Sequence, residues 1–113
     1  MRTMLGCLCA AAATASLAAP PQGFSALLDD AMARMHHAMA SAERTGDPDR
    51  DFVTSMIPHH QGAVDMARAL LLHGKDPALR RLAEGIVADQ QTEIELMERW
   101  LQQHDRHQRE DRR

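Results

Sequence analysis

The fold is decided by residues 46–77, which read GDPDRDFVTSMIPHHQGAVDMARALLLHGKDP. Each end of this stretch places a glycine before an Asp-Pro pair, first at Asp47-Pro48 and again at Asp76-Pro77. Glycine is typical of the position just after a helix, aspartate caps the amino end of a helix, and proline is favoured at the first helical position. Apolar residues between the two corners recur at helical spacing. The stretch therefore predicts one helix with a short connection on either side.

Outward from this stretch, the same signals predict helices over residues 24–45, 48–73 and 77–104. Short connections between long helices favour antiparallel neighbours, so the predicted fold class is all-α, an antiparallel helical bundle. Pro58 lies inside the second helix, where it removes one backbone hydrogen bond and crowds the carbonyl of Thr54, at a cost of about 3 kcal/mol. We therefore expect that helix to be kinked or broken at Pro58, which gives either three long helices or four shorter ones.

The composition supports a single helical domain and indicates no catalytic function. Of the 113 residues, 44% are apolar and only 3% aromatic, and the common residues are helix formers. The net charge is −3 with both signs mixed along the chain, so nucleic-acid binding is not expected. No serine sits in a recognisable nucleophile turn, and no glutamate has a histidine three residues later, as ferritin-type di-iron sites require. The sequence therefore predicts a protein that is not an enzyme.

The amino-terminal residues have the pattern of an export signal. Arg2 precedes an apolar or small-residue run over residues 4–15, and Ser16-Leu17-Ala18 fits the small-x-small cleavage rule. We expect a signal peptide over residues 1–18, a periplasmic or secreted protein, and no membrane span after cleavage. An uncleaved amino-terminal helix and a lipoprotein anchored at Cys7 are the less favoured alternatives.

Both cysteines, Cys7 and Cys9, lie inside the predicted signal. The mature chain then has no thiol, which leaves neither a disulfide framework nor a cysteine metal site. The predicted organisation after cleavage is a helical metal-binding domain over residues 19–105, followed by a charged flexible tail over residues 106–113.

Methionine and histidine occupy unusual positions on the predicted helices. In the first helix, a face that starts with Phe24 and Leu28 ends in the pattern Met-x-x-Met-His-x-x-Met over residues 32–39. In the second helix, two adjacent histidines share a face with methionines, and we expect them to form a buried pair. In the third helix a glutamate interrupts the apolar face, and a carboxylate directed at a bundle core needs a partner. We expect these side chains of all three helices to point into a common interior. The candidate metal ligands are Met32, Met35, His36, Met39, Met56, His59, His60, Met66, Glu93 and Met97.

Each of these residues also has an ordinary explanation. Methionines at helical spacing commonly fill gaps in a core. A single histidine on an apolar face is more often hydrogen-bonded than bound to a metal. Glu93 could ligate a metal, orient a ligating histidine, pair with an arginine or lie at a solvated end. His73, His104 and His107 lie near helix ends or in the tail, and we expect them to be solvated.

Thioether and imidazole groups together suit a soft or borderline ion, with Cu(I) favoured and Cu(II) possible at the imidazoles. Zinc is less suited to a site with no cysteine and few carboxylates. These residues predict an exported copper-binding protein that buffers, sequesters or transfers copper. The alternative is a metal-free interaction or scaffold module whose methionine-rich face docks a partner helix. Apolar surface that the helices leave uncovered predicts a homo-oligomer, a dimer or larger.

Residues 51–67, with Met56-Ile57-Pro58-His59-His60 at their centre, resemble the signature of the bacterial domain-of-unknown-function family numbered 305. Residues 32–39, 74–77 and 91–97 are similar to that family too. The resemblance implies a secreted protein with a ferritin-like helical bundle, and some family members, of the CopM type, are periplasmic copper-binding proteins. Longer members carry the motif twice, so the single copy here implies self-association. Carried onto this chain, their ligand-bearing motifs fall on Met32, Met35, His36, Met39, Met56, His59, His60, Met66 and Met97.

Overall fold

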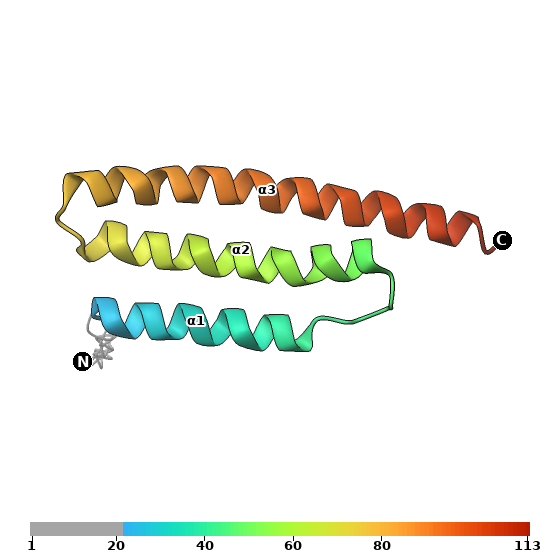
Figure 1. The fold of residues 1–113 in the computed structure, drawn as a ribbon, viewed down its shortest axis with the longest axis horizontal. Helices are drawn as coiled ribbons and strands as arrows, with labels where there is room; N and C mark the ends of the chain where they lie inside the picture. Colours follow the sequence, from blue (N-terminus) through green and yellow to red (C-terminus); the bar gives the residue numbers. More distant parts are fainter. Residues whose placement is uncertain (1–21) are drawn as a thin grey trace, which may run out of the picture.

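The computed structural model describes residues 22–113, which form three α-helices: α1 (Phe24–Ser41), α2 (Pro48–His73) and α3 (Pro77–Glu110). Consecutive helices run antiparallel, with α2 between the other two (Figure 1). The prediction of an all-α, antiparallel helical bundle is therefore confirmed. The predicted signal peptide over residues 1–18 lies outside the described residues. No helix in the described part of the chain is long and apolar enough to cross a membrane.

Both Asp-Pro corners form as predicted. The Asp47 side chain accepts hydrogen bonds from backbone N–H groups at the start of α2, and Asp76 does the same at the start of α3. Each proline occupies the first turn of its helix, where its missing N–H costs nothing. Gly46 has φ +86°, a left-handed conformation that favours glycine. Two capped corners therefore set the lengths and the order of the helices.

The helix α1 ends at Ser41, earlier than the predicted residue 45. The connection after it is held by Asp51, whose Oδ1 accepts from the Thr45 N–H at 2.7 Å and whose Oδ2 accepts from the Gly46 N–H at 3.0 Å. The Thr45 hydroxyl also donates to Asp51 Oδ1. Because these groups bond to a side chain of α2, they are not available to extend α1.

The helix α2 continues through Pro58 without interruption, so residues 22–113 form three helices rather than four. The helix α3 continues to Glu110 instead of ending near residue 104, so the expected flexible tail over residues 106–113 is largely helical. Contacts with the α1–α2 corner hold this end: His104 Nε2 lies 2.9 Å from Asp47 Oδ2, and Arg50 Nε donates to Asp105 Oδ1 at 3.4 Å. In Figure 1 the end of α3 extends beyond that corner.

The three helices form an open layer. The helix α2 packs against both neighbours, whereas no contact joins α1 to α3 among residues 22–113. As a result the buried apolar residues are few and small, and the largest fully buried side chain is that of Val64. The buried apolar residues are Ala31, Val53, Val64, Ala67, Ala69 and Ala83.

Candidate metal centre

One broad side of the layer gathers apolar and methionine side chains from all three helices. On α2, Phe52, Met56, His59, Ala63 and Met66 recur every three or four residues and so share one stripe. An open pocket of about 310 Å³ on this side has lining residues from all three helices. We call this side the methionine face. By helical spacing and pocket lining its residues are Phe24, Leu28, Met32, Met39, Phe52, Met56, His59, Ala63, Met66, Leu70, Leu79, Leu82, Ile86, Leu96, Met97 and Trp100.

The opposite side of the layer combines ion pairs with a second apolar groove. Thr54 and Gln61 lie about half a helical turn away from the methionine face of α2. They line a separate pocket whose other lining residues, Ile57 and Leu101 among them, are mostly apolar.

Arg34 of α1 forms ion pairs with Asp30 and with Asp65 of α2. The hydrogen bond that Arg34 donates to Asp65, together with the charge of Asp30, raises the pKa of Arg34. The Arg34 ion pairs therefore distinguish this side from the methionine face.

His60 and Glu93 connect α2 to α3 at the border of the methionine face. The His60 Nδ1 lies 2.8 Å from the Met56 carbonyl oxygen, and Nε2 lies 2.7 Å from Glu93 Oε2. A carbonyl oxygen can only accept, so Nδ1 carries the proton and Nε2 faces the carboxylate. The His60 side chain is 14% exposed and that of Glu93 is 55% exposed. A backbone carbonyl that fixes Nδ1 in this way leaves Nε2 as the nitrogen available to a metal.

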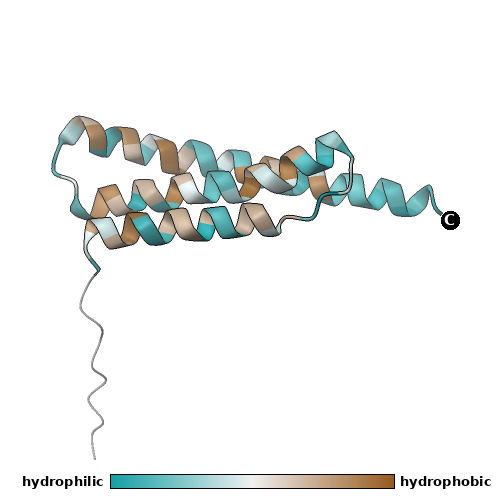
Figure 2. Cartoon of the chain, turned by 60° about the horizontal axis from the view of Figure 1, so that its bottom comes forward, coloured by the Kyte–Doolittle hydropathy of each residue, from teal (hydrophilic) through white to brown (hydrophobic). Residues whose placement is uncertain are grey.

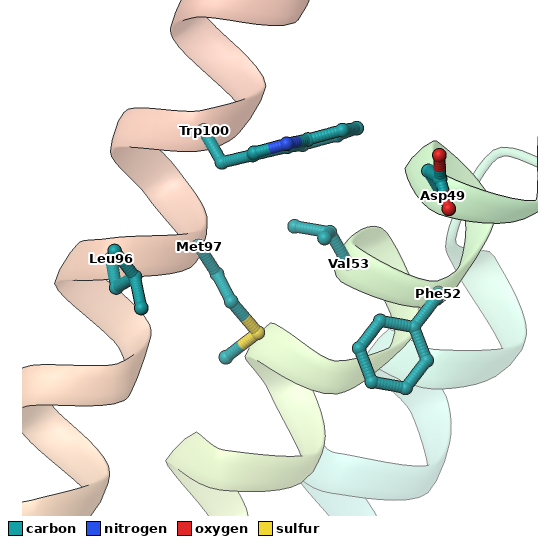
Figure 3. A pocket seen from close by; sticks show the side chains of 6 residues that line it. All are labelled: Asp49, Phe52, Val53, Leu96, Met97 and Trp100. Atoms are coloured by element: carbon teal, nitrogen blue, oxygen red, sulfur yellow. The ribbon is translucent and has the colours of Figure 1, made fainter.

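Methionines lie one turn from this pair on both helices. Met56 is four residues before His60, and Met97 is four residues after Glu93. Because α2 and α3 run antiparallel, both methionines lie on the same side of the His60–Glu93 contact. Figure 3 shows Met97 reaching from α3 toward α2. The arrangement places two thioethers, one imidazole and one carboxylate in neighbouring turns of two helices.

The prediction of a buried histidine pair is wrong. His59 is exposed, and its ring centre lies 5.9 Å from that of His60. Successive residues of a helix point about 100° apart, so His60 is directed at α3 while His59 is directed out of the layer. A pattern of two adjacent histidines cannot put both side chains into one interface.

The predicted ligands of α1 do not converge with those of α3. His36 is exposed, and Met32 and Met39 are half-buried on a helix that does not touch α3. Met35 packs in the seam between α1 and α2, where a Cβ on Gly62 would lie 2.6 Å from its sulfur. Met66 lines the open pocket described above. The candidate ligands therefore spread across one face instead of meeting in a common interior.

Within residues 22–113, no three side chains of the His, Cys, Asp and Glu types gather closely enough to hold a metal ion.

The prediction that His104 is solvated is wrong. Its ring stacks on Trp100 with centres 4.6 Å apart, and it bonds to Asp47. The four-residue spacing of Trp100 and His104 was the available signal for that contact.

Comparison with known proteins gives a family match and one related sequence. The family model described as Domain of unknown function (DUF305) matches residues 1–110. An uncharacterised protein of Acanthamoeba polyphaga mimivirus is 39% identical over 49 residues, which are 43% of this chain and 32% of that protein. The matched part of the chain thus spans about a third of the length of that relative.

Proposed function

The chain belongs to the DUF305 family, and we propose that it binds copper as cargo through thioether and imidazole groups of its methionine face. The observation that carries this proposal is the setting of His60. Its Nδ1 is bonded to the Met56 carbonyl, and its Nε2 is directed toward Glu93 beside two methionines. Such an outer hydrogen bond orients the ring and raises the basicity of the ligating nitrogen in known metal sites.

The donors suit copper better than they suit harder ions. Thioether sulfur and imidazole nitrogen prefer Cu(I), and imidazole also accepts Cu(II). Methionine has no proton to lose, so its sulfur binds over a wide pH range, whereas an imidazole nitrogen binds a metal only when it is unprotonated. Glu93, which faces Nε2, would add a carboxylate oxygen beside it. His59, exposed on the same face, offers a second imidazole to an arriving ion.

A role in buffering, sequestration or transfer fits this arrangement, and we propose it for a periplasmic or secreted protein. The methionines Met32, Met39 and Met66 spread along the face provide further weak donors. The large apolar side chains exposed on the same face also favour a second function, the docking of a protein partner.

Replacing His59 and His60 together with Ala should lower the Cu(I) affinity by about tenfold or more, because both imidazoles of the face are lost. A titration against a competing chromophoric chelator measures this, and a parallel Zn(II) titration should show weaker binding. His107→Ala is the matched control, since His107 is exposed on the last turns of α3, outside the methionine face. Met56→Leu and Met97→Leu remove sulfur at nearly constant volume and should also weaken binding. Unchanged Cu(I) affinity in the double histidine variant would contradict the proposal.

A further inference from the structure

The methionine face exposes large apolar side chains on all three helices. Phe52 is 61% exposed, Leu82 58% and Leu96 61%. In Figure 2 hydrophobic segments occur along all three helices, while the last turns of α3 are hydrophilic. Contiguous apolar patches of more than a few hundred Å² are rare on monomeric proteins and mark interaction sites.

The buried part of the single chain is too small to be the whole core. The buried apolar residues are alanines and valines, and none of the chain's leucine, methionine or phenylalanine side chains is buried in the described part. Burial of such large side chains is the main source of folding free energy, about 1.5–3 kcal/mol for each. A partner that covers the methionine face would bury these side chains and add to the stability of the fold, which favours a permanent partner over a transient one.

The area of the face matches that of a stable dimer interface. The helices α1 and α2 have 18 and 26 residues, which at about 1.5 Å per residue gives lengths of roughly 27 and 39 Å. Three helices about 9 Å apart make a face about 27 Å wide, so its area is roughly 900 Å². Stable protein–protein interfaces remove about 800 Å² of surface from each partner.

The charge pattern fits a second copy of the same chain. In a two-fold interface, residues near the axis meet their own copies, so a charged centre would repel itself. The middle of the methionine face along α2 holds Met56, His59, Ala63 and Met66 and no Lys, Arg, Asp or Glu. Asp49 lies toward one end of the face, beside Phe52 in the pocket that Trp100 also lines. The ion pairs of Arg34 lie on the opposite side of the layer.

From these observations we infer that the methionine face is the interface of a homodimer, in which two three-helix layers pack face to face. Phe52 lies on this interface, in the second turn of α2. His59, exposed in one chain, becomes enclosed between the two layers, beside the His60–Glu93 pair of the same chain. The interface does not require copper, so it stands independently of the proposed function.

Two exposed residues of α2 provide the test. Phe52 is 61% exposed on the methionine face, and Leu72 is 73% exposed on the opposite side of the same helix. In a metal-free buffer containing a chelator, sedimentation equilibrium of the full chain should give the mass of two copies. Phe52→Glu should raise the dissociation constant by about thirtyfold or more, because it replaces a large aromatic interface side chain with a charge. Leu72→Glu should leave the dissociation constant unchanged.

Thermal unfolding followed by circular dichroism keeps the test decisive if Phe52→Glu does not fold. The unfolding midpoint of the unaltered chain should rise with protein concentration, as for any obligate dimer. A single-copy mass with a concentration-independent midpoint would overturn the inference and leave the face to another cover, such as residues 1–21 or a lipid surface. An equal rise of the dissociation constant in Phe52→Glu and Leu72→Glu would also overturn the inference. A monomer that binds copper contradicts only the interface, and a dimer that does not bind copper contradicts only the proposed function.

Discussion

Asp51 holds the α1–α2 connection with a single carboxylate. The backbone N–H of Thr45 is the main cause of a lowered Asp51 pKa, and hydrogen bonds from Gly46 and the Thr45 hydroxyl add to it against a smaller effect of burial. A carboxyl whose pKa is lower in the folded state stabilises that state above its ordinary pKa. That contribution is lost as the pH falls through the folded pKa.

We therefore predict that acidification below about pH 4, the ordinary range of an aspartate, removes the contribution of Asp51. Asp51→Asn should lower the unfolding midpoint at neutral pH, and the difference from the unaltered chain should shrink steadily toward pH 2. Thermal melts across this range measure it. Asp29→Asn, which removes one exposed carboxylate from α1, is the control and should show no such convergence. A difference that stays constant with pH would contradict the role of the charge.

Gly62 sets the distance between α1 and α2. A Cβ at this position would lie 2.6 Å from the sulfur and 2.8 Å from the Cβ of Met35. The sulfur can move, but the Met35 Cβ is fixed to the backbone, so α1 itself would have to shift. Overpacking of this kind costs about 1–3 kcal/mol, whereas the change from glycine to alanine in a helix gains about 1 kcal/mol.

Gly62→Ala should therefore destabilise the protein by up to about 2 kcal/mol, measured by denaturant unfolding. Gly85 of α3 gives a matched control, because nothing lies within 4 Å of a Cβ built there. Gly85→Ala should stabilise the protein by about 1 kcal/mol through helix propensity alone. Stabilisation by both substitutions would show that Met35 can move aside and that Gly62 does not set the distance between α1 and α2.

At the scale of elements, the corner between α1 and α2 also supports the end of α3. Asp47 caps α2 and bonds to His104, and the His104 ring stacks on Trp100. Arg50 adds an ion pair with Asp105. Residues 104 and 105 of α3 are thus bonded to Asp47 and Arg50 at the start of α2. These bonds explain why α3 does not fray after residue 104.

His104→Ala should loosen this end of α3, because both the ring stack and the bond to Asp47 disappear. Hydrogen exchange of the amides in residues 104–110 should become several times faster, with α1 unchanged. His107→Ala, at an exposed position of the same segment, should have no such effect. Unchanged exchange in the first variant would mean that the Arg50–Asp105 ion pair alone holds the helix end.

The elements could be predicted well from local chemistry and their ends less well. Asp47 and Asp76 mark helix starts because the caps involve only neighbouring residues, and both starts are confirmed. The two wrong ends depend on contacts between distant residues. Asp51 binds the connection after α1, and Asp47 holds His104, and neither pairing is visible in the order of the residues.

At the scale of the whole molecule, the sequence predicted which residues share a face but not how the faces are arranged. Helical spacing correctly grouped Phe52, Met56 and Met66 on α2. It could not show that α1 and α3 lie on opposite edges of α2, because periodicity within a helix has no information on its neighbours. The sequence therefore predicted that the candidate metal ligands converge, whereas in the structure they are spread over three helices that lie side by side. The copper site and the predicted homo-oligomer stay proposals.

The open arrangement has a consequence for the way the molecule forms. Because α1 and α3 pack only on α2 in the described part of the chain, each helix–helix contact joins neighbours along the chain. Such contacts close short loops, and proteins rich in them fold fast. The α1–α2 hairpin needs nothing from α3, so it can assemble while α3 is still being synthesised. For the inferred homodimer, the slow event is then the encounter of two chains, and its rate rises with their concentration.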